Sequence, residues 1–395
     1  MIPRIRRIYI QNFRSIDRTV VDLEPLTVLV GPNGAGKSNF VGALEFFQRC
    51  VTEGLEQVFR FSTPNPRWHV ELEQPPLGFK VELDLAPDAT AVYSFLIRHD
   101  IPEPLVERET CSVFHAGVEI AGFEVADGNF VREISGIRPQ LSGGRLALAA
   151  ASAVPEFRPV YDLIAGILTY SIHPKEVCGF SGSTAPNDTL STKGSNAPAV
   201  LRAIQEKFPE VHARIERLMA QAVGGITGIR TKLGEQWQSI EFMKDLGDDQ
   251  PSLFLAHEMS DGTLRLLGLL LAIYQPRRPS VLVIEEPEAT VHPAIAELVM
   301  QVFLDAGRRQ QVILTTHSPD LLDAKELSDD QIRVVSQQHG RTVIAPLGRA
   351  SRQAIRDRLY TPGELLRLAE LDDDADGALA AAAACDPFAE MPAST

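Results

Sequence analysis

The sequence predicts an α/β protein with a mixed central sheet, an antiparallel β subdomain and a helical lobe. An apolar strand at 26–30 leads into a glycine-rich loop and then into a helical pattern, which is the start of a strand–helix unit. Short alternating runs punctuated by prolines follow between 59 and 134 and favour an antiparallel meander. From residue 257 onward helical and apolar strand patterns alternate, as they do in sheets with parallel strands.

Length and composition limit the class of protein. The chain has 395 residues, of which 44% are hydrophobic, so we expect one large domain with insertions or two subdomains. The longest apolar run, at 266–274, has about half the length that a bilayer requires, and no secretory signal is expected. The four cysteines lie far apart, which suggests neither a zinc site nor a disulfide framework. A cytoplasmic location is therefore expected.

The net charge of −14 disfavours non-specific nucleic-acid binding by the whole surface. A local basic patch is compatible with it, although scattered surface arginines are the alternative; the candidates are Arg4, Arg6, Arg7 and Arg14. The acidic run at 372–376 is interpreted as a solvated charge block rather than a metal site.

Periodicity assigns the remaining elements. Two strands are expected within 4–21, and further strands at 79–85, 91–97, 112–120, 130–134, around 229 and 240, at 280–284 and at 311–315. Hairpin turns are expected at 127–129 and 338–340. Helices are expected from 146, at 160–168, at 197–223 with an interruption near Pro209, and at 263–274, 293–303 and 361–371.

These patterns divide the chain into parts. Residues 1–371 are expected to form one unit, with a nucleotide-binding core at 1–55 and 250–350, a β-rich segment at 56–135 and a helical lobe or insertion at 136–249. The tail at 372–395 is acidic and then alanine-rich, so we expect it to be poorly ordered.

Residues 31–38, GPNGAGKS, match the phosphate-binding pattern G-x-x-x-x-G-K-[ST] at every fixed position. In this motif backbone N–H groups cradle phosphate oxygens, the lysine reaches the β- and γ-phosphates and the serine hydroxyl binds Mg²⁺. The strand before the loop and the helix after it support the assignment. The nucleotide-binding residues predicted here are Asn33, Gly34, Ala35, Gly36, Lys37, Ser38 and Asn39.

Two later strands end in polar residues suited to the same site. The apolar run 281–284 ends in Glu285, which can hold Mg²⁺ with Ser38, and in Glu286, which can polarise the attacking water. A buried strand with a solvated acidic end is the alternative. The next apolar strand ends near His317, which can reach a γ-phosphate, although a lone histidine is more often structural.

Residues 260–265, SDGTLR, precede a leucine-rich helix. Ser260 and the N–H of Gly262 can form an anion site at the helix N-terminus. An ordinary N-cap is the alternative interpretation when the motif is considered alone.

The order of these four motifs resembles the head domain of RecF/SMC/OLD-like ABC-type ATPases, and most closely the stand-alone bacterial "AAA family" predicted ATPases. The opening segment 10–16 is also similar to the family's first strand. The resemblance implies a P-loop NTPase fold of the ABC-ATPase head type, with ATP and Mg²⁺ as cofactors and slow ATP hydrolysis. It also implies a head-to-head homodimer, in which Lys37 and Ser38 of one chain and Ser260 and Gly262 of the other hold each ATP. His317 would then sense the γ-phosphate.

The chain departs from the family pattern at several positions. Glu285 stands where many ABC proteins have aspartate, a form similar to that of OLD and stand-alone relatives. Residues 141–145, LSGGR, look closer to the transporter signature than 260–263 do, but they lie too far before the acidic strand and are assigned to a loop. The glutamine that links nucleotide to the helical lobe is not placed, and Gln140 is only a candidate.

The absence of a long coiled coil and of a nuclease domain narrows the choice of subfamily. The helical insertion is too short for an SMC coiled coil, and fewer than about eighty residues follow His317, which is too few for an OLD-type nuclease domain. With a complete ATPase motif set and no second catalytic centre, we expect a switch that acts on DNA or on a separate effector such as a nuclease, without a membrane partner. The resemblance implies DNA repair or anti-phage defence as its context. A nucleotide-binding regulatory or scaffold subunit with little turnover is the alternative, and a transporter motor is a weaker one.

Overall fold

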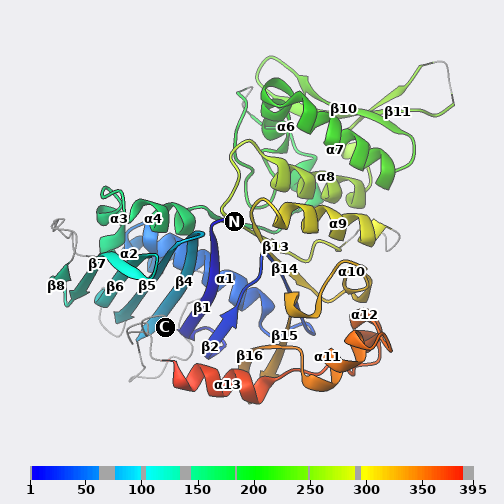
Figure 1. Ribbon diagram of the computed structural model, residues 1–395. Coiled ribbons are helices and arrows are strands. Elements are labelled where there is room, and N and C mark those ends of the chain that lie inside the picture. The colour runs from blue at the N-terminus through cyan, green and yellow to red at the C-terminus, as the bar shows by residue number, and fades with distance from the viewer. Residues whose placement is uncertain are drawn as a thin grey trace.

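A computed structural model describes residues 2–61, 76–98, 104–133, 144–182, 185–247, 250–289 and 295–385. Its elements form an antiparallel sheet on one side, a central mixed sheet, and a lobe that rises above the central sheet (Figure 1). The predicted fold class is confirmed, because a mixed sheet, an antiparallel β subdomain and a lobe with helices are all present.

The antiparallel sheet has seven strands within the described residues, in the order β2-β1-β4-β5-β6-β7-β8. Its strands are β1 (Arg4–Phe13), β2 (Ile16–Asp22), β4 (Leu77–Ala86), β5 (Ala89–Arg98), β6 (Leu105–His115), β7 (Val118–Ala126) and β8 (Asn129–Glu133). The helices α2 (Leu55–Phe61), α3 (Ala147–Ala151) and α4 (Arg158–Ala165) belong to the same core. The opening strands therefore belong to the sheet of the predicted β-rich segment rather than to the central sheet, because β1 pairs with β4 and β2 pairs with β1.

The central sheet has the order β16-β15-β3-β14-β13-β9. Its strands are β3 (Leu26–Val30), β9 (Ile167–Tyr170), β13 (Val281–Glu285), β14 (Gln311–Thr316), β15 (Ile332–Gln338) and β16 (Arg341–Pro346). All neighbours pair in parallel except β16, which returns antiparallel along β15. The carboxyl ends of β3, β13 and β14 therefore meet at one edge, where ligands bind in open α/β sheets.

Both faces of the central sheet are covered. Helix α1 (Lys37–Thr52) lies in a core shared with the antiparallel sheet, in which Phe47 stacks with its ring centroid 5.4 Å from that of Phe79 and 5.7 Å from that of Phe95. The other face packs against α8 (Asp261–Tyr274) and α9 (Ala296–Gly307) in a second core. Every residue of α8 from Thr263 to Tyr274 is buried, which explains why its sequence is apolar almost all round.

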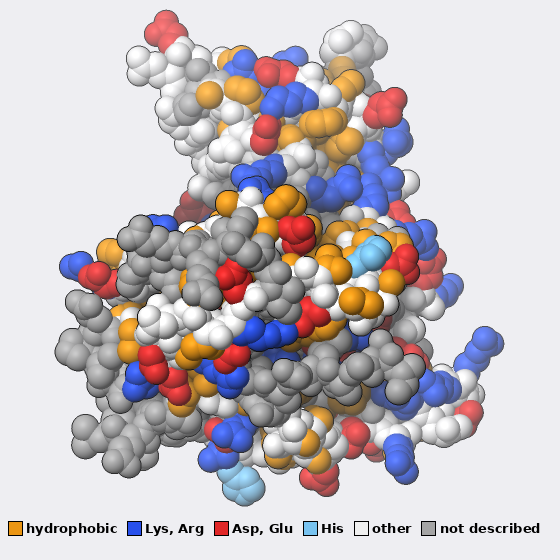
Figure 2. Space-filling model, turned by 60° about the vertical axis from the view of Figure 1, so that its left-hand side comes forward, with side chains coloured by type: hydrophobic (Ala, Val, Ile, Leu, Met, Phe, Trp, Pro, Cys, Tyr) orange, Lys and Arg blue, Asp and Glu red, His pale blue; other side chains and the backbone are white. Residues whose placement is uncertain are grey.

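The lobe follows β9 in the chain and ends at α8. It contains α5 (Pro174–Val177), α6 (Ala197–Lys207), α7 (Pro209–Ala222), β10 (Ile226–Leu233), β11 (Gln238–Lys244), β12 (Ser252–Leu255) and the 3₁₀ turn Ala256–Glu258. Strands β10, β11 and β12 form an antiparallel sheet beside α6 and α7. Figure 2 shows this lobe above a narrower waist. The lobe therefore joins the body mainly through α8, the helix that carries the Ser260 motif.

The C-terminal part closes around the outer edge of the central sheet. It contains α10 (Pro319–Leu322), a 3₁₀ turn at Asp329–Gln331, α11 (Arg349–Arg356), α12 (Pro362–Arg367) and α13 (Ala375–Ala384). Helix α13 packs on β2 and β16, where the sequence predicted a poorly ordered tail. Its alanine side chains are small enough for close packing on the strands. The prediction is therefore wrong for these residues, and 386–395 lie outside the described residues.

The acidic run at 372–376 is not simply solvated. Asp373 accepts a hydrogen bond from the hydroxyl of Ser336 at 2.7 Å, and Asp374 caps α13 by accepting from the N–H of Gly377. Asp372 accepts from the N–H of Ser351 at 2.8 Å. Two of the carboxylates therefore tie the segment before α13 to the body and a third caps the helix, which periodicity alone does not reveal.

Three other local expectations need correction. The run 112–120 contains a hairpin turn rather than one strand, because Ala116 and Gly117 both adopt positive φ values. Ile167 and Leu168 belong to β9 and not to the preceding helix. Strand β12 was not predicted. Residues 290–294, which include the predicted start of the helix at 293–303, lie outside the described residues.

The surface carries both signs of charge intermixed on the face in Figure 2. The candidate basic patch near the chain start is neutralised: Arg4 pairs with Asp84, Arg6 with Glu82 and Arg7 with Asp22. Arg14 is partly buried beneath the phosphate loop helix, against Gly42. Among the described helices, none is both long enough and apolar enough to span a bilayer.

Candidate functional site

The phosphate loop connects β3 to α1 at the carboxyl edge of the central sheet. Gly34 and Gly36 adopt φ values of +81° and +110°, which a residue with a side chain rarely takes. At Gly36 a Cβ atom would also lie only 1.9 Å from the hydroxyl of Thr342. Both glycines are thus required by the positive φ values of the loop, and Gly36 is also required by its close contact with Thr342 on β16.

Thr342 supports the loop from below. Its hydroxyl donates to the carbonyl of Ala35 at 3.1 Å and lies 2.6 Å from the hydroxyl of Ser15, which also accepts from Asn39. Its N–H donates to the carbonyl of Ser15 at 2.7 Å. The hairpin of β15 and β16 therefore fixes the loop through a segment more than 300 residues away in sequence.

Lys37 is buried at the start of α1, with an exposed fraction of 6%. Its Nζ donates to the carbonyls of Gly31 at 2.7 Å and Pro32 at 3.1 Å. Burial lowers the pKa of Lys37, and the carboxylates of Glu286 and Glu288 oppose that shift. The ammonium group is therefore partly desolvated, and its hydrogen bonds within the described residues go to neutral carbonyls, so a phosphate oxygen would be a stronger partner.

Ser38 and Glu285 lie together, and the serine side chain is hydrogen-bonded to the carboxylate. Burial raises the pKa of Glu285, and the bond from Ser38 opposes this rise. A hydroxyl and a carboxylate fit Mg²⁺, a cation that prefers oxygen ligands and usually keeps waters and substrate phosphates as its other ligands. Among the described residues no group of three or more His, Cys, Asp or Glu side chains could hold a metal alone. A bound nucleotide would have to complete this site.

Glu286 follows the strand in a left-handed conformation, with φ of +43°. Its N–H donates to the carbonyl of Thr315 at 3.0 Å and to the hydroxyl of Thr315 at 3.2 Å, while its own carbonyl accepts from Nη2 of Arg265 at 2.8 Å. A strained backbone at a polar site persists when several contacts hold it. The Glu286 side chain is 40% exposed. Hydrogen bonds therefore fix its backbone, while its carboxylate remains accessible to a ligand.

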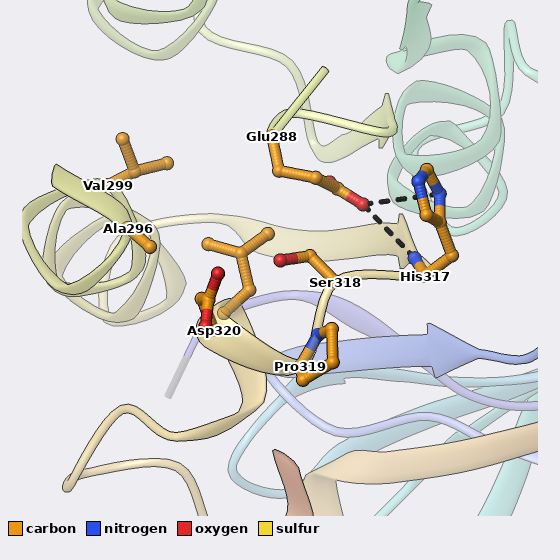
Figure 3. A pocket seen from close by; sticks show the side chains of 8 residues that line it. Glu288, Ala296, Val299, His317, Ser318, Pro319 and Asp320 are labelled. Carbon is orange, nitrogen blue, oxygen red and sulfur yellow. Dashed lines mark hydrogen bonds and ion pairs between the residues drawn. The ribbon is translucent and has the colours of Figure 1, made fainter. Parts of the chain in front are cut away.

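His317 lies after β14 and faces two carboxylates. Its Nδ1 is 3.7 Å from Oε1 of Glu286 and 3.5 Å from Oε1 of Glu288. Figure 3 shows Glu288 directed at both the ring and the backbone nitrogen of His317, beside a pocket that extends to Ala296 and Val299. The structure thus brings His317 to the acidic residues that follow the neighbouring strand β13.

Ser260 and Gly262 lie at the N-terminus of α8. The Ser260 hydroxyl accepts from the N–H of Thr263 at 3.3 Å and lies 2.8 Å from its hydroxyl. The N-cap interpretation therefore holds within one chain, and Ser260 remains exposed. A contribution to the nucleotide site of a second chain stays a prediction. Gln140 and residues 141–143 lie outside the described residues.

Three residues of the site were not identified from the sequence: Arg265, Glu288 and Thr342. Arg265 is only 8% exposed and belongs to the quoted motif, and a charged residue inside an otherwise apolar helix is a signal that could have been used. Glu288 completes the quoted Glu-Glu-Pro-Glu run. Thr342 carries no local signal, because its contact with the loop depends on the tertiary fold.

Two family models match the segments that contain these motifs. Residues 4–58, with the phosphate loop, match an AAA ATPase domain, and residues 191–323, with Ser260, Glu286 and His317, match "AAA domain, putative AbiEii toxin, Type IV TA system". The two matched segments carry AAA ATPase domain signatures, and the chain resembles the SMC/RecF-like ABC-type ATPases. The resemblance drawn from the motifs is therefore confirmed.

Solved structures and curated relatives agree with this assignment. The Smc head domain of Pyrococcus furiosus, with an extended coiled coil and bound to the C-terminal domain of ScpA, is similar to this AAA ATPase with a TM-score of 0.51 at 13% identity; the match covers 91% of this chain and 100% of that one. At this identity the similarity shows the fold alone.

Among curated proteins, the phosphonates import ATP-binding protein PhnC 1 of Ruegeria sp. (strain TM1040) is 26% identical over 123 residues. The tungstate uptake system ATP-binding protein TupC of Peptoclostridium acidaminophilum is 28% identical over 103 residues. The matches cover 31% and 26% of this ATPase and 46% of each relative. The chain thus spans less than half the length of the curated relatives it matches.

Proposed function

We propose that this chain binds and hydrolyses ATP with Mg²⁺ and uses the nucleotide as a switch. The observation that carries the proposal is the grouping at one sheet edge of Lys37 in the phosphate loop, the Ser38–Glu285 pair, and Glu286 beside His317. The names of the curated relatives state ATP binding, which agrees with this site.

Each group has a distinct role in the proposal. Lys37 and the N–H groups of the loop bind the phosphates, with Asn33, Gly34, Ala35, Gly36 and Asn39 completing the cradle. Ser38 and Glu285 hold Mg²⁺, which neutralises charge on the phosphates. Glu286 orients and polarises the attacking water. His317 contacts the γ-phosphate, and Lys37 stabilises the charge that develops on it.

We further propose that two chains assemble head to head around two ATP molecules. Ser260 and the N–H of Gly262 lie at an exposed helix N-terminus, which suits an anion brought by another molecule. Each ATP then contacts the phosphate loop of one chain and the Ser260 motif of the second. ATP binding closes the dimer and hydrolysis releases it.

The process under control is proposed to be DNA repair or anti-phage defence, through DNA or through a separate effector such as a nuclease. The description of the family model that matches 191–323 names a putative toxin of a toxin–antitoxin system, which supports a defence context. The Smc head of Pyrococcus furiosus was solved with a bound partner protein, so a head of this fold can dock an effector.

A regulatory subunit with little turnover is the second candidate. The features in its favour are Glu285, which stands where many ABC proteins have aspartate, and the acidic net charge of the chain. Nucleotide binding without hydrolysis, measured with stoichiometric partner and DNA present, would favour it.

The test uses the purified chain and the variant Glu286→Gln, which keeps the size and polarity of the side chain and removes the carboxylate. We expect slow Mg²⁺-dependent ATP hydrolysis by the wild type. The variant should lose hydrolysis, keep ATP affinity and become a stable dimer with ATP but not with ADP, as measured by light scattering. A variant that binds ATP and remains monomeric would rule out the head-dimer mechanism.

A further inference from the structure

The histidine of the site depends on a carboxylate that the proposed mechanism does not use. Oε1 of Glu288 accepts a hydrogen bond from the hydroxyl of Thr316 at 2.7 Å and another from the N–H of His317 at 3.0 Å. The same oxygen lies 3.5 Å from Nδ1 of the His317 ring (Figure 3). One carboxylate oxygen therefore contacts both the backbone and the ring of the residue.

The placement of Glu288 differs from that of an ordinary surface carboxylate. Its side chain is 11% exposed, and within the described residues Oε2 is buried without a hydrogen-bond partner. Burying a carboxylate costs free energy unless hydrogen bonds or ion pairs offset the loss of its hydration. The hydroxyl of Thr316 also accepts from the N–H of Ser318 at 2.9 Å, so the turn after β14 is organised around this side chain.

We propose that Glu288 is a positioning residue that holds His317 for the γ-phosphate of ATP. This inference rests on the proposed function of His317 as the γ-phosphate contact. A carboxylate beside Nδ1 keeps a proton on that nitrogen, because the partner of one ring nitrogen fixes the state of the other. Nε2 is then the nitrogen left for the phosphate.

Other charged groups surround the histidine. Glu286 reaches the same ring nitrogen at 3.7 Å from the loop after β13. Lys37 on α1 and Arg265 on α8 both interact electrostatically with Glu286 and Glu288. Glu286 makes no hydrogen bond to the backbone of His317 among the described contacts, whereas Glu288 does. Glu288 is therefore the residue that fixes the position of His317.

The first experiment compares steady-state kinetics of Glu288→Gln with those of the wild type. Glutamine keeps an oxygen that can accept from Thr316 and from the N–H of His317, and it removes the charge beside the ring. We expect kcat to fall about tenfold, the loss of one charge-assisted contact, with less than a twofold change in KM for ATP and an unchanged Tm. Glu288→Met, which removes the acceptor as well, should lower both kcat and Tm.

Two controls separate positioning from a general structural effect. Asp320→Asn changes the charge of a carboxylate that lines the same pocket but pairs with Arg367, so its kinetics should match the wild type. In a His317→Ala background, Glu288→Gln should change kcat less than twofold. A tenfold loss in that background as well would overturn the proposal.

The second experiment needs no hydrolysis. In nucleotide-free protein labelled with ¹⁵N-histidine, the ring nitrogen shifts of His317, assigned through their loss in His317→Ala, should change in Glu288→Gln and stay unchanged in Asp320→Asn. Unchanged shifts in Glu288→Gln would overturn the inference. Changed shifts in a protein that binds ATP without hydrolysing it would support the positioning of His317 by Glu288 and would reject the proposed hydrolysis.

Discussion

Two glutamates show how the two sheets of the molecule differ. Glu109, on β6 of the antiparallel sheet, is 1% exposed and accepts hydrogen bonds from the hydroxyl of Tyr93 and from the N–H groups of Ala147 and Leu148. Glu286, at the edge of the central sheet, has a strained backbone and a half-exposed carboxylate. Both carboxyl groups belong to a sheet or its edge, but among the described contacts only the first has both oxygens hydrogen-bonded inside the chain.

The difference distinguishes structural from functional polar groups. A buried carboxylate with complete hydrogen bonds joins β6 to the start of α3 and stabilises the packing of one on the other. A carboxylate left accessible, near a histidine and a lysine whose described hydrogen bonds go to neutral carbonyls, retains capacity for a ligand. Substitutions on the two sheets should therefore separate stability from activity, in the order given below from the largest effect to the smallest.

The largest effect is expected at the aromatic cluster of the antiparallel sheet. Phe47→Ala removes a fully buried ring that stacks on Phe79 and Phe95, and should lower the free energy of unfolding by about 3–5 kcal/mol in urea titrations. Phe61→Ala, at a side chain that is 63% exposed, is the control and should cost less than about 0.5 kcal/mol. A loss below about 1 kcal/mol for Phe47→Ala would show that this cluster does not govern stability.

The next effect is on ligand binding and not on stability. Lys37→Ala removes the desolvated ammonium of the phosphate loop, so we expect ATP affinity to fall about 100-fold, measured by calorimetry, with no loss in Tm. Lys207→Ala, at an exposed lysine paired with Asp188, should bind ATP as the wild type does. A change below threefold for Lys37→Ala would place the nucleotide elsewhere.

The third prediction concerns pH. Burial raises the pKa of Glu109 to about 7, against 4.5 for the free side chain. Between these values the folded chain binds a proton that the unfolded chain does not, so this group's contribution to stability falls as pH rises, by about 1.4 kcal/mol per pH unit. Glu109→Gln should remove that slope between pH 5 and 7 in urea titrations. Equal slopes for the two proteins would contradict the raised pKa.

The smallest effect is expected at the contact between α8 and Glu286. Arg265→Met removes the donor to the carbonyl of Glu286 and should lower kcat about five- to tenfold, since the strained backbone loses one of its holding contacts. Arg265→Lys can restore one hydrogen bond and should retain more activity. If both variants turned over like the wild type, the two bonds from Thr315 would be sufficient to hold Glu286.

Local patterns identified much of this architecture. The strand–loop–helix unit at the phosphate loop, the hairpin at 127–129 and the acidic strand are encoded within short windows, where apolar period and glycine placement suffice. The pairing of β1 with β4 was not accessible, because strand partners far apart leave no mark in local periodicity. Strand β9 was taken for the end of a helix for the same reason.

The candidate site shows the same division. Lys37, Ser38, Glu285, Glu286 and His317 belong to contiguous motifs, and the structure brings them to one edge. Glu288 and Arg265 lie inside the same motifs, but their partners are on other elements, so their contacts follow only from the three-dimensional packing. The roles of the site residues in catalysis remain proposals that the variants above address.

The contact between Thr342 and the phosphate loop has a consequence for how the protein is made. The hydroxyl that supports Ala35 lies 307 residues further along the chain. At synthesis rates of roughly 5–20 residues per second, the loop leaves the ribosome roughly 15–60 s before that support is translated. We expect stalled nascent chains that lack β16 to be poorly retained on immobilised ATP. The chain would then bind nucleotide only after its C-terminal part has been synthesised.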